Sequence, residues 1–289
     1  MRFLATVLMW IITTVLAAAA IPALWVQRNL VSQDGYAALA QHAATDPALQ
    51  SAMADELTTV VSGLGSDVDA TLVRGIAGMY TASSSFPGQF GQANAFAHRW
   101  LFTDSIPADV DAQGRWVIDL APMLSDNAFT QTLLDYNISV PSSVPVPLTD
   151  NAPAILRPGA LSVYGRLAPW AAWGLAVLAC VAALLMLIFA RRRGRALVAL
   201  GVSGLVIGAG GWVAMEYGQR YLNKALAGFS GDLRTVADAM VATAKTGMHQ
   251  WFTVTLVVGG GLVIVGVVVS LLTGMASASA AGTRKPTRT

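Results

Sequence analysis

The chain has 289 residues, of which 55% are hydrophobic and 12% are charged, and its formal net charge is +2. Soluble domains usually carry about 25% charged residues, so this composition argues against an ordinary soluble protein and favours a membrane protein. The single cysteine, Cys180, excludes an intramolecular disulfide and a thiolate metal cluster.

Four apolar stretches are each long enough to cross a bilayer, because about 20 residues at roughly 1.5 Å rise span a hydrocarbon core of about 30 Å. We predict transmembrane helices at residues 1–26, 167–190, 196–215 and 251–272. The expected fold class is mainly α: a four-transmembrane-helix bundle with a mostly helical extracytoplasmic domain that contains a minor β or extended element.

The first predicted span, residues 1–26, has two interpretations. Arg2, an apolar run and the small-residue stretch LAAAAIPA are the parts of a secretory signal peptide. The apolar run is longer than that of most signal peptides, so we favour an uncleaved signal anchor over a cleaved signal peptide. Cleavage would remove one span without moving the other segments across the membrane.

The distribution of charge predicts the topology. Basic residues that flank spans stay on the cytoplasmic side, and an arginine cluster occupies residues 191–195. We therefore expect this turn, both termini and a disordered tail at 273–289 to be cytoplasmic at the plasma membrane. Segments 27–166 and 216–250, which hold every Asp and Glu, are then extracytoplasmic. Tryptophans at the predicted outer ends of the spans fit an interfacial belt (Trp25, Trp170, Trp173, Trp212 and Trp251).

Segment 27–166 is large enough to bury its own core, and its net acidic charge argues against nucleic acid as a partner. Asp46 and Pro47 predict a helix start, and the helix should end at Gly63 or Gly65. Its expected inward face is Leu49, Met53, Leu57, Val60, Val61 and Leu64.

Two further helices are predicted in the same segment. Ser66 or Asp67 should cap the first, with Val68, Leu72, Ile76, Met79 and Tyr80 turned inward. The second follows Phe86 and Pro87 and should present Phe90, Ala97, Trp100 and Leu101.

Past Pro107 the pattern changes. RWVIDL predicts a short strand after the turn DAQG, and a helix is expected at 122–136. SVPSSVPVPLTD should be extended because closely spaced prolines forbid a helix. Residues 160–170 should form a helix that continues into the second span.

Segment 216–250 contains an amphipathic pattern. We expect Ser230 to cap a helix, Asp232 to occupy its first turn, and Lys245 with Gly247 to close it. Its apolar stripe is Leu233, Val236, Met240 and Ala244. We favour the larger outer domain as the partner of this stripe, and the outer membrane leaflet is the alternative.

Acidic motifs offer weak candidates for a metal site. DVDA occurs at 67–70 and 109–112, and paired carboxylates can share a divalent ion. The first copy fits a helix start better. In the second, Asp109, Asp111 and Gly114 match the opening of a calcium loop, but Leu120 stands where a bidentate acid is needed, so we favour a polar hairpin turn.

The histidines, His42, His98 and His249, have no zinc-binding spacing, and no nucleophile elbow or phosphate loop occurs. His98, Arg99, Trp100 and Asp104 could bind an anion, although a helix surface with one buried tryptophan is the favoured interpretation. The sequence therefore predicts no catalytic, cofactor-binding or metal-binding residue, and we expect no cofactor and no enzymatic activity.

Small residues recur inside the spans. Gly204 and Gly208 form a G-x-x-x-G step, and Gly266, Ser270 and Gly274 form a similar ridge. We favour packing between neighbouring spans of one chain over a dimer face. Apart from Arg2 at the start of the first span, the spans carry no charged residue, which argues against a pump or an ion-coupled carrier.

Four motifs carry a resemblance to a known group. They are DPALQSAMADEL, WVIDLAPML, RLAPWAAWGLAVL and the arginine cluster that follows. In their order, after an N-terminal anchor, the chain resembles a group of actinobacterial integral membrane proteins. The resemblance covers most of the chain and implies this architecture and a location in the cell envelope, but no site residues.

These observations lead to two functional hypotheses. The first is a non-enzymatic plasma-membrane protein whose extracytoplasmic domain binds an envelope protein or a membrane complex as an accessory or scaffold. The alternative is a lipid or small-molecule binding protein that assists envelope lipid transport, with a cleft lined by aromatic residues (Phe86, Phe90, Phe96, Trp100 and Phe102).

Overall fold

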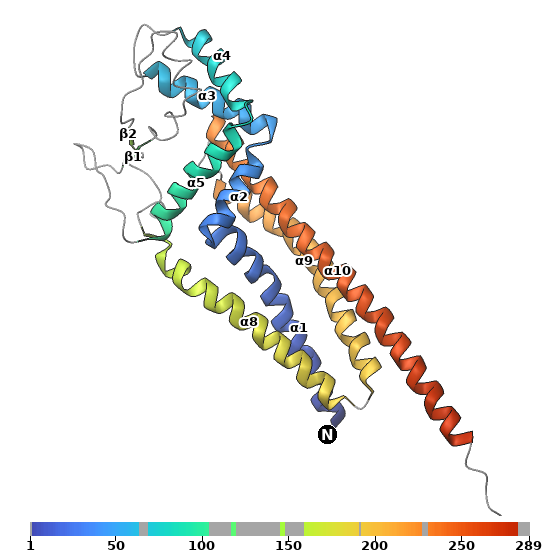
Figure 1. Ribbon diagram of the computed structural model, residues 1–289. Coiled ribbons are helices and arrows are strands. Elements are labelled where there is room, and N and C mark those ends of the chain that lie inside the picture. Colours follow the sequence, from blue (N-terminus) through green and yellow to red (C-terminus); the bar gives the residue numbers. More distant parts are fainter. Residues whose placement is uncertain are drawn as a thin grey trace, which may run out of the picture. The chain divides into compact units, whose positions relative to one another are not determined.

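The computed structural model describes residues 2–63, 69–103, 117–119, 145–147, 159–190, 192–226 and 231–282 (Figure 1). These residues are almost entirely helical, which confirms the mainly α fold class. The chain divides into two compact units. Unit 1 comprises residues 1–25, 170–221 and 246–289, and unit 2 comprises residues 26–169 and 222–245.

Four helices are long and apolar enough to cross a membrane, as the sequence predicts. They are α1 (Arg2–Val26), α8 (Ser162–Phe189), α9 (Arg193–Ala225) and α10 (Gly231–Gly282). Large apolar side chains on their outer faces are exposed, among them Ile188 at 70% and Val257 at 71%. Such a surface suits a lipid environment.

α1 ends at Val26, as predicted, whereas α8, α9 and α10 are longer than their predicted spans. α8 begins at Ser162, which confirms a helix at 160–170 continuous with the second span. α9 begins at Arg193, so the predicted turn 191–195 is too long, because arginine and alanine are good helix formers. The C-terminal end of α9 likewise continues past residue 215 to Ala225.

Two predictions about the region of α10 are wrong: the helix end at Lys245 and Gly247, and the disordered tail from residue 273. Lys245 and Gly247 do not close a helix, since α10 runs through them without interruption into the fourth span. Gly247 instead lies beside the indole of Trp25, which is 4% exposed and therefore buried in protein. The tail predicted as disordered from residue 273 is helical as far as Gly282, where alanine is frequent, and residues 283–289 lie outside the described residues.

Unit 2 begins with a π-helix, η1 (Gln27–Val31), which follows α1 directly. Four α-helices come next: α2 (Gln33–Ala43), α3 (Pro47–Gly63), α4 (Ala70–Thr81) and α5 (Phe86–Phe102). Local chemistry explains their starts. Oxygens of Ser32, Asp46 and Asp69 accept hydrogen bonds from backbone N–H groups in the first turns of α2, α3 and α4.

The predicted start and end of α3 are confirmed at Asp46 and Gly63. The cap of α4 is Asp69, so the expectation of Ser66 or Asp67 is wrong by two residues or more. α2 was not predicted individually, although Ser32 with Leu39, Ala40 and Ala43 follows the pattern of a capped amphipathic helix.

The core of unit 2 is built from large apolar side chains of α3, α4 and α5 and small ones of α2. Its buried members are Ala40, Ala43, Ala44, Leu49, Ala54, Leu57, Ile76, Ala77, Tyr80, Phe86, Phe90 and Ala239. The inward face predicted for α3 is confirmed where it is described, with Leu49, Leu57 and Val61 buried and Met53 and Val60 packed on the core.

One residue of this core comes from α10. Ala239 is buried in it, and Val236 and Met240 pack against it. The predicted amphipathic stripe therefore meets the larger domain rather than a membrane leaflet. Leu233 and Ala244 of that stripe are not members of this core, and the Leu233 side chain is 50% exposed.

The inward face predicted for α4 is confirmed at Ile76 and Tyr80 and wrong at Leu72 and Met79. Val73, Ile76, Ala77 and Tyr80 are buried, whereas Met79, expected inward, is 66% exposed and Leu72 is 36% exposed. Apolar residues lie on both sides of this helix, so periodicity could not decide which side faces the core.

The end of α5 is joined to the start of α8. The Gly159 N–H donates to the Trp100 carbonyl, and the Leu161 N–H donates to the Leu101 carbonyl, both at 2.9 Å. These bonds satisfy carbonyls that a helix end leaves free. Gly159 has a φ of 69°, a conformation that favours glycine.

Between these two points the structure describes one strand pair. β1 (Val117–Asp119) lies antiparallel to β2 (Pro145–Pro147), with Ile118 opposite Val146. The predicted helix at 122–136 lies outside the described residues, and the wider β or extended element stays a prediction.

Candidate functional site

In unit 1, α9 and α10 meet along a glycine seam, which comprises five glycines of α9 and two of α10: Gly194, Gly201, Gly204, Gly208, Gly211, Gly259 and Gly266. A Cβ added to Gly201 would lie 2.6 Å from the Gly259 carbonyl oxygen. A Cβ added to Gly211 would lie 2.3 Å from the Phe252 ring. At Gly201 the two backbones therefore approach too closely for a side chain, and at Gly211 the Phe252 ring occupies the space that a side chain would need.

The seam decides between the two interpretations of the small-residue steps. Gly204 and Gly208 face Gly259 and Leu256 of the same chain, and Gly266 faces Val198. The favoured prediction, packing between neighbouring spans, is confirmed for these residues. The side chain of Ser270 lies against Gly194, and the surroundings of position 274 lie outside the described part of the structure.

α1 joins unit 1 through polar contacts with α9. The Trp10 Nε1–H donates to the Ala199 carbonyl at 3.0 Å, and the Thr14 and Ser203 hydroxyls are hydrogen-bonded at 2.7 Å. Both pairs are spaced one helical turn apart on each helix, so they stand one above the other. Trp25 adds a packing contact with Gly247 of α10.

The second aromatic feature of unit 1 is a stacked pair. The rings of Trp212 and His249 are nearly parallel, with an interplanar angle of 3° and a centroid distance of 4.0 Å. The His249 Nε2 atom is buried and has no partner among the described residues. This histidine is therefore packed as a flat ring beside the seam.

The strongest candidate site in unit 2 surrounds His98 of α5. Its side chain is 4% exposed, and its Nε2 atom lies 3.0 Å from the carbonyl oxygen of Leu30 in η1. Because a carbonyl can only accept, Nε2 carries the proton and the neutral ring keeps its lone pair on Nδ1. Nδ1 is buried and has no partner among the described residues.

Two aromatic rings enclose this imidazole. Phe102, one turn along α5, stacks on it at a centroid distance of 4.2 Å and an interplanar angle of 7°. Tyr36 of α2 lies tilted at 5.4 Å. We call His98, Leu30, Tyr36 and Phe102 the His98 cluster. It joins η1, α2 and α5 at one point.

The backbone beside this cluster is tightly fitted. The Ser32 N–H donates to the Gln27 carbonyl at 2.9 Å, five residues back, which defines the π-turn. A Cβ on Gly35 would lie 1.7 Å from the Arg28 carbonyl oxygen, so only glycine allows α2 to fold back against η1.

Burial governs the ionisation of the cluster. It lowers the pKa of His98 below the ordinary 6.5, and the carbonyls of Leu30 and Val31 act in the opposite direction with a smaller effect. Burial also raises the pKa of Tyr36 above 10.0. Both side chains are therefore neutral at pH 7.

The other acidic residues and histidines considered in the sequence do not form a site within the described residues. Asp69, from the first DVDA, caps α4, which confirms the structural interpretation of that residue. His42 is exposed on α2. Asp104 and the turn at 109–114, predicted as a polar hairpin with a calcium loop as the alternative, lie outside the described residues. Within the described ranges, no three His, Cys, Asp or Glu side chains are grouped so that they could hold a metal ion.

The described part of the group His98, Arg99, Trp100 and Asp104 fits the favoured interpretation, a helix with a buried tryptophan, rather than one anion-binding surface. Trp100 and His98 are buried, whereas Arg99 is exposed and its guanidinium lies 5.9 Å from the Phe96 ring centroid. Adjacent residues of a helix point in different directions, so this separation follows from the 3.6-residue period.

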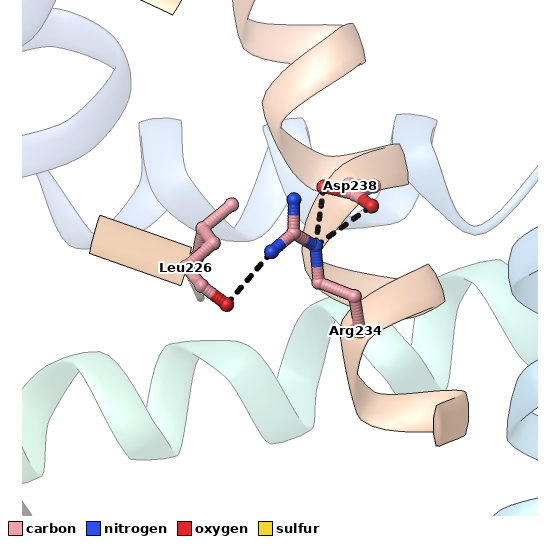
Figure 2. A network of polar contacts seen from close by, with 3 residues as sticks. All are labelled: Leu226, Arg234 and Asp238. Atoms are coloured by element: carbon pink, nitrogen blue, oxygen red, sulfur yellow. Dashed lines mark hydrogen bonds and ion pairs between the residues drawn. The ribbon is translucent and has the colours of Figure 1, made fainter. Parts of the chain in front are cut away.

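Sequence reasoning missed a polar network in unit 2 (Figure 2). Arg234 Nε donates to both carboxylate oxygens of Asp238, at 3.0 and 2.9 Å, and Nη1 donates to the Leu226 carbonyl at 2.8 Å. Leu226 lies directly after α9, where free carbonyls attract a cation. The i,i+4 pair was visible in the sequence, but its link to the end of α9 was not.

Comparison with known proteins gives no match: no family model fits the chain, and neither a curated protein nor a solved structure is found to be similar. The resemblance to actinobacterial membrane proteins therefore stays a prediction.

Proposed function

We propose that this is a non-enzymatic integral plasma-membrane protein whose extracytoplasmic unit 2 binds an envelope protein or a membrane complex. In this proposal the four apolar helices cross the membrane, both termini are cytoplasmic, and the bilayer is the environment of unit 1.

The observation that carries the proposal is an exposed apolar strip on α4, formed by Leu72, Gly75 and Met79. These positions share one helix face. Met79 is 66% exposed, and nothing lies within 4 Å of where a Cβ of Gly75 would stand. The opposite face of α4 is sealed in the core, so the strip is held rigidly outward. A flexible methionine beside an open backbone suits docking of another protein.

Several charged side chains of unit 2 have structural roles. Asp46 and Asp69 cap helices, Asp55 pairs with Arg74 at 2.6 Å, and Arg234 pairs with Asp238. These roles support a scaffold rather than a catalyst, because each of these groups stabilises the start of a helix or forms an ion pair within or between helices.

The lipid-binding alternative depends on aromatic residues that line a cleft. Phe86, Phe90 and Trp100 are at most 5% exposed. Phe86 packs edge-on against Tyr80 with a centroid distance of 5.6 Å and lies 5.7 Å from Phe90. These rings fill the core of unit 2, which favours a protein partner over a lipid.

The contacts of α1 support a retained first span. Cleavage after the small-residue stretch would remove Trp10 and Thr14, which hydrogen-bond to α9. The intact mass of the protein extracted from membranes tests this part of the proposal. A mass that lacks the first 20 or so residues would refute it.

The docking strip can be tested by photocrosslinking in native membranes. A photoreactive residue at Met79 should give an adduct with a different protein, whereas one at Gln92, exposed on α5, should not. Leu72→Glu should abolish the Met79 adduct because it puts a charge in the strip. Gln92→Glu, with the same added charge elsewhere, should leave it unchanged.

Two outcomes would contradict the proposal. Met79 adducts that contain only this chain would indicate self-association. Adducts that are equal at both positions, or that survive Leu72→Glu, would show that α4 is not the docking surface.

A further inference from the structure

We propose that His98 is a proton-sensitive latch, which ties α5 to the π-turn at the end of the first helix and releases it in mild acid. This inference does not depend on the proposed function. It rests on a hydrogen bond across the fold, a buried nitrogen without a partner, and the backbone geometry of η1.

The latch bond is long-range in sequence. His98 is 68 residues from Leu30, and the bond at 3.0 Å fixes the ring to η1. π-turns are rare and recur at functional positions. The donor from α5 ties this turn to a second element of unit 2.

Protonation would destabilise the buried position of the His98 ring. The cation gains a proton on Nδ1, which is buried without a hydrogen-bond partner among the described residues. The Leu30 and Val31 carbonyls favour the cation, but burial, which disfavours it, has the larger effect on the pKa of His98. A buried unpaired donor costs about 1–3 kcal/mol, and more when it is charged. Stacking on Phe102 offsets part of this cost, but the faces of Tyr36 and Phe102 supply no hydrogen-bond acceptor in the ring plane.

No exposed charge on the surrounding elements replaces that acceptor. Tyr36 is the titratable side chain that contacts the His98 ring. Burial raises the pKa of Tyr36, so it stays neutral. The charged or titratable residues of η1, α2, α5 and the start of α8 that surround the cluster are all exposed: Arg28, Asp34, His42, Arg99 and Arg166.

The direction of the pH effect follows from the lowered pKa of His98. The unfolded or opened chain binds the proton more readily than the latched state. The stabilisation is therefore complete above pH 6.5 and is lost as the pH falls through the lowered value.

Hydrogen–deuterium exchange on the full-length protein in lipid nanodiscs tests the latch. Rates for peptides that cover residues 27–36 are measured between about pH 7.5 and about pH 4.5 and corrected for the intrinsic pH dependence of exchange. We expect protection to fall about tenfold in acid, while peptides of α3 and α4 keep theirs.

Three variants make the test specific. His98→Gln keeps an N–H donor for the Leu30 carbonyl but does not titrate, so it should stay protected at both pH values. His98→Phe removes the donor and should be unprotected at both. His42→Gln, which removes an exposed histidine of α2, should behave like the wild type.

The proposal is overturned by an acid loss that is the same in His98→Gln as in the wild type, or by wild-type protection that does not change. If His98→Gln does not fold, the wild-type protein still gives an answer through the NMR titration of its histidine rings. One ring must titrate below 6.5 together with the η1 amides, and a His98 ring that titrates at or above this value refutes the latch.

Discussion

The helices pack against one another through different kinds of residue in the two units. In unit 1, α9 and α10 approach through glycine, with backbone against backbone at Gly201, Gly204 and Gly259. In unit 2 the helices are held apart by large side chains, of which Phe86 and Leu49 are fully buried.

The difference reflects the solvent that each unit suits. Burial of apolar surface drives association in water, so a core of large side chains is favourable there. Lipid tails are as apolar as leucine, so helices in a membrane associate through close van der Waals contact and small residues. The composition of each interface thus indicates its environment independently of hydropathy.

The largest expected effect comes from the core of unit 2. Phe86→Ala should destabilise the protein by about 3–5 kcal/mol, because it leaves a cavity where a completely buried ring packed. Chemical unfolding followed by tryptophan fluorescence measures this change. Phe96→Ala, at a ring that is 37% exposed, is the control and should cost much less. Equal losses would mean that Phe86 is not part of a tightly packed core.

The glycine seam of unit 1 should be destabilised by a larger side chain, whereas the core of unit 2 is destabilised by a smaller one. Gly201→Ala places a methyl 2.6 Å from the Gly259 carbonyl oxygen, which forces the helices apart at a cost of roughly 1–3 kcal/mol. Gly210→Ala is the matched control, because nothing lies within 4 Å of its Cβ position.

Thermal unfolding in detergent compares the two glycine variants. Gly210→Ala should be neutral or slightly stabilising, since alanine is the better helix former by about 1 kcal/mol. If both variants lower the midpoint equally, the seam is not the close contact between α9 and α10.

Sequence reasoning succeeded where one local rule decides the outcome. An aspartate before a proline was enough to start α3, and apolar runs were enough to find four helices that could span a membrane. It failed at Gly247, where a helix-breaking residue is kept inside α10 beside the indole of Trp25. A packing partner that is more than 200 residues away in the chain overrides the local preference.

The candidate site was harder to predict for the same reason. A His98 and Phe102 pair, one turn apart, is visible as an i,i+4 aromatic contact. The bond to Leu30 is not visible, because a backbone carbonyl carries no sequence signature and is exposed to another element only through the π-turn. On α4 the sequence correctly placed Ile76 inward but wrongly placed Met79 there as well, because the two side chains are equally apolar.

The smallest expected effect is at the polar contact between α1 and α9. The hydroxyls of Thr14 and Ser203 lie 2.7 Å apart, and each is also within reach of a carbonyl of its own helix, Trp10 and Ala199 respectively. Each hydroxyl has one proton, so the interhelical bond competes with these local ones.

Thr14→Val should therefore cost only about 0.6 kcal/mol, the average for interhelical hydrogen bonds in membranes. A double-mutant cycle with Ser203→Ala isolates the coupling, because either single variant removes the same contact. A coupling near zero would mean that the hydroxyls bond only within their own helices. A coupling well above the average would instead make α1 a strongly bound member of unit 1, held by polar rather than by glycine contacts.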